Sequence, residues 1–302
     1  MSSLAKRVSF ISAPGGVGKT KLALLLTGYL AKQNKKVLFI DLDPTAGASL
    51  LLLDETIFEN EIEKGHSLAD LIDDYMDNKS IDIRDYIIEE PVYIYNYPFE
   101  LLLPGEKLMD LMDRLWNSVE PGNIFKEILE KSGINAYYDY VVIDTIPFFI
   151  PKYTALSIYV SSTVFIPLRP SLVDLKRTLI MVKNRILKLN TEQTYCIFNQ
   201  VPTRVQSAEY ILVNRKVLNR NLDLPKSTIE EYALLEKYYD KLASRVRFLP
   251  IFLKYLLAIE RFPPFRRGFK KLELYSEQLI KDEKEIARKN VSEVLEEMIK
   301  VL

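Results

Sequence analysis

The chain has one cysteine and one histidine among its 302 residues. A single cysteine cannot form a disulfide within the chain, nor can it supply the thiolates of a zinc or iron–sulfur site held by one chain. A single histidine excludes metal sites built from several histidines and makes a Ser-His-Asp active site a poor prediction. The scarcity of cysteine is typical of proteins from a reducing cytoplasm.

Long apolar runs are also missing. No stretch reaches the roughly 18–20 apolar residues of a membrane-spanning helix. Residues 1–7 are mostly polar and do not have the pattern of a secretion signal. Apolar residues make up 48% of the chain and charged residues 27%, which is ordinary for a folded globular protein. We therefore expect a folded cytoplasmic protein.

The net charge is zero, with 41 basic and 41 acidic side chains, but the two signs are unevenly distributed. Residues 51–130 hold twenty acidic and only six basic side chains, so the remainder of the chain is strongly basic. The acidic segment cancels the positive charge of the remainder in the total. A net charge of zero therefore does not exclude a nucleic-acid partner.

Short apolar runs alternate with stretches of helical periodicity along the chain. Strands are expected at 7–12, 36–41, 92–97, 101–103, 140–143, 163–167, 195–199 and 247–249. Helices are expected at 19–33, 67–76, 107–116, 123–132, 171–190, 207–221, 228–243 and over most of 270–301. This alternation predicts an α/β fold, with a mostly parallel twisted β-sheet flanked by helices on both faces. No linker is evident, so we expect a single domain over 1–302 that is mostly helical from about 252 onward.

Glycine is scarce, and three of the ten glycines lie in one short loop between the first strand and the first helix. This phosphate loop comprises residues 12–20 and reads SAPGGVGKT. Glycines let the backbone wrap a phosphate chain with its N–H groups inward, and the helix start adds the positive end of its dipole. Lys19 can reach the β- and γ-phosphates, and Thr20 can place its hydroxyl on Mg²⁺. Ala13 departs from the Walker A pattern, which has glycine there, but its methyl group is small.

Further segments match one family in order along the chain. They are 41–44 (DLDP), 101–105 (LLLPG), 138–147 (YDYVVIDTIP), 165–175 and 249–250 (LP). Together with GGVGKT in the phosphate loop, they resemble the ParA/Soj/MinD ATPases, the deviant Walker A group of P-loop proteins. The resemblance extends over roughly residues 7–300 and implies a P-loop ATPase with ATP and Mg²⁺ as cofactors.

The resemblance also assigns roles to individual residues. It implies that Asp43 positions or activates the attacking water and senses the γ-phosphate. Lys19 and Asp43 are therefore the expected catalytic residues. Asp144, at the end of a buried strand, would hold Mg²⁺ together with Thr20 and Asp43. Asn199, at the end of a later strand, could pair with the adenine edge. The full set expected to contact ATP is Pro14, Gly15, Gly16, Val17, Gly18, Lys19, Thr20, Lys21, Asn199 and Pro250.

One position departs seriously from the family. The family's signature lysine, two residues before Gly16, reaches the partner's phosphates in a sandwich dimer, and this chain has Pro14 there. Proline carries no charge and no N–H. Lys152 and Arg169 are candidate substitutes because each follows a matched strand, and Lys21 replaces a threonine of the family pattern. We therefore expect ATP binding with slow turnover.

The resemblance to ParA implies a partition ATPase that segregates plasmid or chromosomal DNA. Such a protein forms a homodimer on binding ATP, coats DNA without sequence preference, and hydrolyses ATP when a ParB-like centromere-binding adaptor stimulates it. It would be cytoplasmic and associated with the nucleoid. Contacts to the phosphate backbone need clustered basic side chains. The candidates are Lys176, Arg177, Lys183 and Arg185 on the helix expected at 171–190, and Arg266, Arg267, Lys270 and Lys271 in a late loop.

Other classes of the superfamily stay open. A MinD-like membrane-cycling protein would end in a basic amphipathic helix. Residues 283–302 instead include several glutamates, so we expect no membrane partner. Branches with metal clusters need paired cysteines, and Cys196 is predicted to be a core residue on a strand. A regulatory nucleotide-binding scaffold with weak ATPase activity, or a small-molecule ligase or kinase, are the alternatives.

Overall fold

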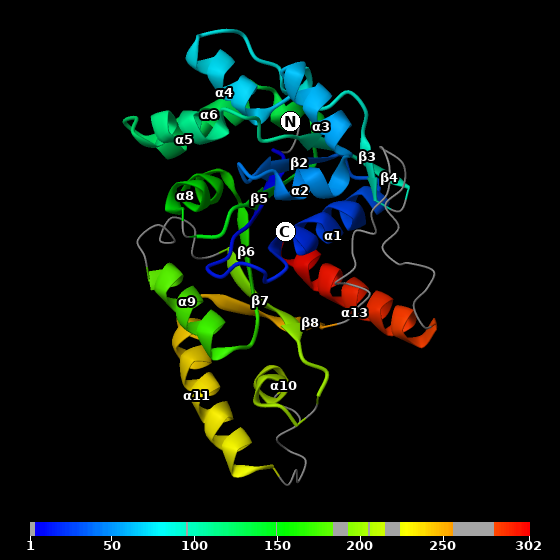
Figure 1. Cartoon of the computed structure of the whole chain (residues 1–302), viewed down its shortest axis with the longest axis vertical. Helices are drawn as coiled ribbons and strands as arrows, with labels where there is room; N and C mark the ends of the chain where they lie inside the picture. Colours follow the sequence, from blue (N-terminus) through cyan, green and yellow to red (C-terminus); the bar gives the residue numbers. More distant parts are fainter. Residues whose placement is uncertain are drawn as a thin grey trace.

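The computed structural model describes residues 4–94, 96–148, 150–183, 193–204, 206–214, 224–255 and 281–302, with the side chains of 281–287 left aside. Within these ranges an eight-stranded sheet has the order β3-β4-β2-β5-β1-β6-β7-β8 (Figure 1). Its strands are β1 (Lys6–Phe10), β2 (Val37–Leu42), β3 (Val92–Ile94), β4 (Tyr97–Leu102), β5 (Tyr140–Thr145), β6 (Thr163–Leu168), β7 (Thr194–Val201) and β8 (Arg247–Lys254). All neighbouring pairs are parallel except β3 with β4.

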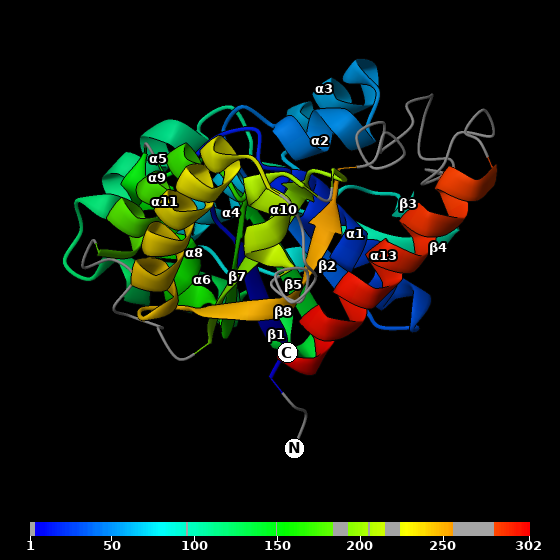
Figure 2. The ribbon, with the colours of Figure 1, turned by 90° about the horizontal axis from the view of Figure 1, so that it is seen from below.

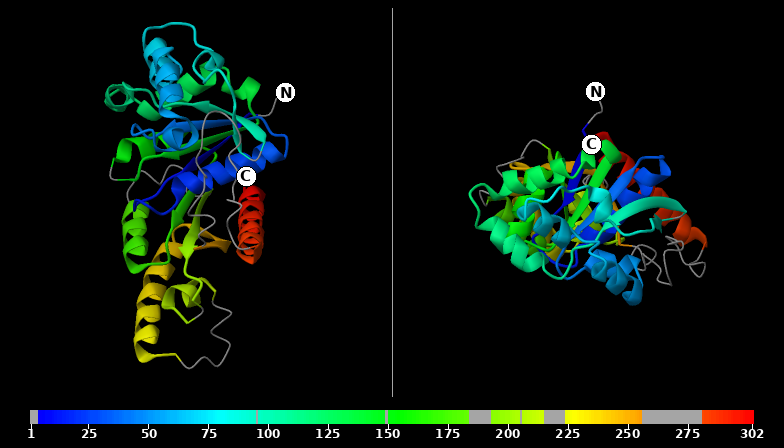
Figure 3. Two further views of the ribbon diagram at one scale, coloured as in Figure 1. Left: turned by 45° about the vertical axis from the view of Figure 1, so that its right-hand side comes forward. Right: turned by 90° about the horizontal axis from the view of Figure 1, so that it is seen from above.

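Helices cover both faces of the sheet, as Figures 2 and 3 show from other sides. One face carries α1 (Lys19–Lys32), α2 (Gly47–Leu52), α3 (Glu55–Glu63) and α13 (Lys281–Lys300). The other carries α4 (Leu68–Met76), α5 (Leu108–Trp116), α6 (Pro121–Lys131), α7 (Ile134–Tyr137), α8 (Pro151–Val160), α9 (Leu172–Lys183), α10 (Ala208–Val213) and α11 (Lys226–Ala243). A short 3₁₀ turn, η1 (Ile83–Asp85), precedes β3. This arrangement confirms the predicted fold class.

The central strands are apolar because both of their faces are covered. Every residue of β2 and β6 is buried, which is the pattern of a parallel sheet between two helical layers. Cys196 lies fully buried in β7, where burial raises the pKa of its thiol, so the prediction of a core cysteine is confirmed. None of the helices among the described residues is long and apolar enough to span a bilayer.

Two strand predictions were wrong. The strand expected at 92–97 is divided, because an antiparallel turn between β3 and β4 lies inside it. Asn96 in that turn has a φ of 79°, a left-handed conformation that asparagine tolerates better than most residues. The strand expected at 247–249 continues as β8 through Pro250 to Lys254, into the part expected to be mostly helical from about 252. A proline is tolerated there because β8 is the edge strand and need not donate on its free side.

A buried asparagine covers part of that free edge. The side-chain amide of Asn290, on α13, donates to the carbonyl of Phe252 at 3.0 Å. Its oxygen accepts the N–H of Lys254 at 2.9 Å. These two bonds take the place of a neighbouring strand at the end of β8.

Several helices were not expected from the sequence, namely α2, α3, α7 and α8. Helix α8 shows why: seven of its ten residues are buried, so it has no polar face to reveal a helical period. Helix α9 is described only to Lys183, so the rest of the helix expected at 171–190 lies outside the described residues. The same holds for 215–223 and for 256–280.

Candidate nucleotide-binding site

The phosphate loop leaves β1 at the carboxyl edge of the sheet and enters α1. Gly16 and Gly18 have φ angles of 70° and 78°, the left-handed region that favours glycine. At Gly18 a Cβ would also lie 2.4 Å from Nδ2 of Asn199, so any larger residue would clash there. Glycine at this position is therefore required by both the backbone angle and the close approach of β7.

The strand β5 brings a carboxylate to the two polar residues that open α1. Lys19 Nζ lies 2.6 Å from Oδ1 of Asp144, and the Thr20 hydroxyl donates to Oδ2 at 2.6 Å. The ion pair is almost closed to solvent, with side-chain exposures of 7% for Lys19 and 1% for Asp144. The structure thus brings together three of the predicted site residues. A hydroxyl and a carboxylate oxygen are the donors that Mg²⁺ prefers, so these residues fit the expected cofactor.

A second carboxylate lies beside the first. Asp41 of β2 is in register with Asp144, and both are buried. Asp41 accepts the backbone N–H and hydroxyl of Ser49 at 2.9 and 2.7 Å, and the N–H of Asp43 at 3.1 Å. Burial and the neighbouring Asp144 raise the pKa of Asp41 to about 7, against the opposing effect of these hydrogen bonds. No role was predicted for Asp41 itself, although it belongs to the matched DLDP segment.

Asp43 faces the same edge of the sheet but is tied to its own loop. Its Oδ1 accepts the N–H of Thr45 at 2.9 Å and the Thr45 hydroxyl at 2.7 Å. The carboxylate is only partly buried, so solvent and ligands can reach it. Ala46, next along, has a φ of 55° and begins α2, which places the Asp41 partner Ser49 in the first turns of that helix.

The end of β7 contacts the phosphate loop from the other side. Nδ2 of Asn199 donates to the carbonyl of Val17 at 2.6 Å, and Nε2 of Gln200 donates to the carbonyl of Gly16 at 3.1 Å. Pairing of Asn199 with adenine stays a prediction, because its amide is engaged with the loop here. No role was predicted for Gln200, whose position next to Asn199 at a strand end is its one signal in the sequence.

The position of the missing signature lysine is apolar and closed. Pro14 is buried, whereas Gly15 and Gly16 beside it are exposed. The two candidate substitutes both have partners within the chain. Lys152 forms an ion pair with Asp113. Arg169 forms one with Asp174, at 2.7 Å from Nε to Oδ2. Their service in place of the signature lysine stays a prediction.

The remaining predicted residues that the structure describes lie on α1, α9 and β8. Lys21 is half-buried on α1, and Pro250 is exposed on the edge strand β8. Lys176, Arg177 and Lys183 lie on the exposed face of α9. That face also carries two exposed apolar side chains, Val173 and Ile180. Arg185, Arg266, Arg267, Lys270 and Lys271 lie outside the described residues.

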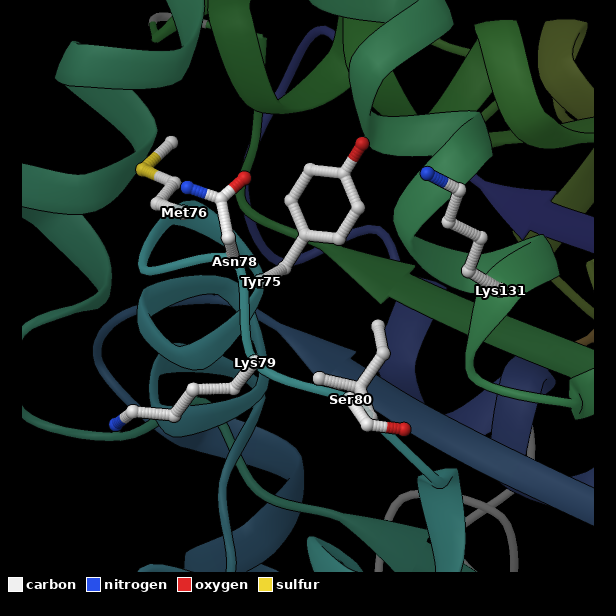
Figure 4. A pocket seen from close by; sticks show the side chains of 7 residues that line it. Tyr75, Met76, Asn78, Lys79, Ser80 and Lys131 are labelled. Carbon is white, nitrogen blue, oxygen red and sulfur yellow. The ribbon is translucent and has the colours of Figure 1, made fainter.

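A separate pocket of about 450 Å³ opens between α4 and α6 (Figure 4). Its lining residues are Tyr75, Met76, Asn78, Lys79, Ser80, Ile81 and Lys131. Both of its lysines have acidic partners: Lys79 pairs with Asp74, and Lys131 pairs with Glu127. No residue of the phosphate loop lines it, so we place the candidate nucleotide site at the loop and not in this pocket.

The described residues offer no cluster of three or more histidine, cysteine, aspartate or glutamate side chains that could hold a metal ion. In nucleotide sites, Mg²⁺ is commonly held by one or two carboxylates together with phosphate oxygens. Thr20 and Asp144 would then supply ligands, and Asp43 as a further Mg²⁺ ligand stays a prediction.

A parallel α/β sheet, a glycine loop that enters a helix, and a Lys-Thr pair beside a strand-end carboxylate define a P-loop nucleotide-binding protein. A family model described as an AAA domain matches residues 5–197, which is more than half of the chain. The chain therefore belongs to this family, the ParA/MinD-type P-loop ATPases.

Curated relatives are distant in sequence. The chain is 26% identical over 269 residues to the chromosome-partitioning ATPase Soj of Treponema pallidum. This alignment covers 80% of the chain and 97% of Soj. It is 29% identical over 168 residues to an uncharacterised protein of Methanocaldococcus jannaschii. That alignment covers 54% of the chain and spans 59% of the relative's length, so the chain spans less than two thirds of it.

Solved structures share the fold at low identity. Apo McdA of Cyanothece has a TM-score of 0.61 at 20% identity, over 98% of the chain and 99% of McdA. A plasmid partition protein of Borrelia burgdorferi has 0.51 at 20%, over 80% and 100% of the two chains. Cobyrinic acid a,c-diamide synthase of Mycobacterium smegmatis, with bound ADP and magnesium, has 0.55 at 17%, over 81% and 98%.

Proposed function

We propose that this protein is a ParA-like partition ATPase that binds ATP with Mg²⁺, dimerises, and binds DNA without sequence preference. The observation that carries the proposal is the convergence of Lys19, Thr20 and Asp144 at the phosphate loop. The likeness to Soj over most of both chains supports the partition role. The chain would act as one domain, in the cytoplasm and on the nucleoid.

The site residues would divide the chemistry of ATP hydrolysis among them. Lys19 would leave Asp144 and neutralise the β- and γ-phosphates. Thr20 and Asp144 would hold Mg²⁺, which supplies positive charge at the phosphate oxygens when bound. Asp43 would release Thr45 and orient the attacking water. Since the buried Pro14 cannot supply a charge to a partner's phosphates, basal turnover would be slow.

DNA would be bound through its phosphates by exposed basic side chains. Lys176, Arg177 and Lys183 stand on one exposed helix face, which is the arrangement that non-specific backbone contacts need. The four basic residues at 266–271 stay candidates of the same kind. A ParB-like adaptor would stimulate hydrolysis and release the DNA.

The test measures oligomer mass and DNA binding with ATP, with ADP and without nucleotide. We expect a dimer that binds unrelated DNA sequences equally with ATP, and a monomer with little DNA affinity otherwise. DNA affinity should fall steeply as salt is raised, because phosphate contacts release counterions. A Lys19→Ala variant should stay monomeric in all three conditions. A wild-type monomer that ignores DNA in every nucleotide state would overturn the proposal.

A second candidate is a small-molecule ligase or kinase of the same superfamily. It is favoured by Pro14, which removes the charge that family sandwich dimers use, and by the similar fold of the Mycobacterium smegmatis diamide synthase. A monomer that hydrolyses ATP only when a small-molecule carboxylate is added would support this candidate. A nucleotide-binding monomer with no turnover under any condition would instead indicate a regulatory scaffold.

A further inference from the structure

We infer that Tyr153, in the first turn of α8, is a positioning residue for Asp43: its hydroxyl donates to the Asp43 carboxylate when a γ-phosphate draws Asp43 away from Thr45. The inference rests on the proposed ATP hydrolysis and deepens it, because it identifies what holds Asp43 in its working orientation. Its basis is a buried hydroxyl that has no hydrogen-bond partner among the residues that the structure describes.

The hydroxyl of Tyr153 is costly to the fold as it stands. Tyr153 is completely buried, and its ring belongs to the apolar cluster between the sheet and helices α5, α6 and α8. A buried hydroxyl without an acceptor destabilises the folded state, since it has lost its bonds to water. Phenylalanine would fill the same space without that cost. Unsatisfied buried polar groups are few in native proteins, and a role in the reaction is one of the reasons for keeping them.

The topology of the sheet brings Tyr153 and Asp43 to one place. Strands β4, β2 and β5 are neighbours and run parallel, so the segments that follow them meet at the same carboxyl edge. These segments are α5, the loop that holds Asp43, and α8. Tyr153 is near the start of α8, so its side chain lies beside this edge.

The charges around the hydroxyl indicate which acceptor it fits. Burial raises the pKa of Tyr153 to about 12, and nearby carboxylates add to the rise, so the hydroxyl stays protonated and acts as a donor at neutral pH. These carboxylates are those of Asp113, Asp43 and Asp110. Asp113 is paired with Lys152, and Asp110 is exposed on α5. Asp43 is half-buried and is therefore the best acceptor for a buried donor.

Asp43 needs a new partner at the moment when it acts. Its Oδ1 accepts the N–H and the hydroxyl of Thr45 at 2.9 and 2.7 Å. When Asp43 releases Thr45, as the proposed hydrolysis requires, its carboxylate loses both bonds and its fixed direction. A bond from Tyr153 replaces them from a helix packed against the sheet. A fixed carboxylate is what the orientation of an attacking water requires.

The experiment replaces Tyr153 by phenylalanine, which removes the hydroxyl and keeps the ring. ATP hydrolysis is measured in a single turnover with the protein in excess. We expect Tyr153→Phe to lower the rate about tenfold, the effect of one hydrogen bond to a charged group. The affinity for ADP should not change, because ADP brings no γ-phosphate to Asp43. The matched control is Tyr159→Phe, at a 43% exposed tyrosine of the same helix, which should change neither quantity.

Stability distinguishes positioning from a purely structural role. The hydroxyl has no partner among the described residues, so its removal takes no hydrogen bond from the fold. Without nucleotide, Tyr153→Phe should therefore unfold in urea at the wild-type midpoint or at a higher one. A lower midpoint would show that the hydroxyl supports the fold and would overturn the inference. An unchanged rate of hydrolysis would overturn it as well.

A second comparison tests the route through Asp43 and needs no turnover, so it also decides the case of a protein that hydrolyses ATP too slowly to measure. A non-hydrolysable ATP analogue with Mg²⁺ should raise the unfolding midpoint of Tyr153→Phe less than that of wild type. In proteins that also carry Asp43→Ala the acceptor is gone, so the rise should be the same with and without Tyr153→Phe.

The outcomes of this comparison are distinct. Equal rises in wild type and Tyr153→Phe, or unequal rises in the two proteins with Asp43→Ala, would show that the hydroxyl does not act on Asp43. If the wild-type protein binds neither ATP nor ADP, the proposed function fails instead, so the two failures can be distinguished.

Discussion

The phosphate loop is held differently on its two sides, one facing β5 and the other facing β7. On the β5 side, Asp144 binds the side chains of Lys19 and Thr20. On the β7 side, Asn199 and Gln200 bind only backbone carbonyls. The β5 contacts use the very groups that a nucleotide and Mg²⁺ need, so they must be exchanged when the ligand arrives. The β7 contacts are accepted by loop carbonyls, which do not bind phosphate, so these contacts can persist.

This difference has a consequence for binding. Removing one partner of a buried ion pair strongly destabilises the folded protein, because the other charge is left without compensation. Phosphates that draw Lys19 away from Asp144 leave such a charge, and Mg²⁺ at Asp144 would compensate it. Nucleotide and metal are therefore expected to bind cooperatively on the β5 side.

The largest expected effect on nucleotide binding comes from removing Lys19, which pairs with Asp144 on the β5 side. A Lys19→Ala variant loses the charge that would meet the phosphates, so ATP affinity should fall at least about a hundredfold. Isothermal titration with ATP and Mg²⁺ measures it, and circular dichroism verifies the fold. The control is Lys32→Ala, an exposed lysine in the last turn of the same helix. Equal ATP binding by Lys19→Ala and wild type would remove the phosphate-loop assignment.

A smaller effect, also on the β5 side, distinguishes the contribution of the metal to ATP affinity from that of the nucleotide. In Asp144→Asn the ion pair with Lys19 is absent, so Lys19 is free to meet phosphates without Mg²⁺. We expect ATP affinity in EDTA to rise and ATP affinity with Mg²⁺ to fall, each by about tenfold. Asp139→Asn, an exposed position just before the amino end of β5, is the matched control. If EDTA weakens ATP binding equally in both variants, then Asp144 does not restrain Lys19.

The third effect is on stability and not on nucleotide binding: the adjacent β2 strand should give the free energy of unfolding a pH dependence. Asp41 has a pKa raised from 3.8 to about 7 in the folded state, so the folded protein binds the extra proton between these values. The free energy of unfolding should therefore decrease as pH rises from about 4 to about 7, with each pKa unit worth about 1.4 kcal/mol. Urea unfolding in EDTA measures it.

Asp41→Asn is the variant for this test, since asparagine does not titrate. Its stability curve should be flatter than that of wild type between pH 4 and 7, and the two curves should run parallel above pH 8. If the wild-type slope persists unchanged in the variant, then other groups titrate in this range and Asp41 is ionised throughout.

The residues that meet on the β5 side of the loop could be predicted from the sequence. The contact of Gln200 on the β7 side could not. Lys19 and Thr20 are consecutive in a motif, and Asp144 ends an apolar run, so residue type and position sufficed. Gln200 depends on a bulge and a left-handed φ, which no periodicity reveals. The burial of Pro14 was also hidden, because it depends on the packing of segments far apart in the chain.

Two wrong predictions of secondary structure have the same kind of cause. Helix α8 was missed because its buried surroundings remove the polar face that a helical pattern needs. Strand β8 was shortened because Pro250 normally stops a strand, and only its place at the sheet edge makes it acceptable. Periodicity reports one element and its environment, whereas both of these outcomes depend on neighbours from other parts of the chain.

The asparagine on α13 bears on how the chain is made. Synthesis proceeds from the amino end, so β8 leaves the ribosome before Asn290 does. Until then Phe252 and Lys254 have an open carbonyl and an open N–H that α13 later covers. An uncovered strand edge can pair with another nascent chain, and such pairing leads to aggregation. Helix α13 thus covers a strand edge that stays open to pairing with other nascent chains until Asn290 has been synthesised.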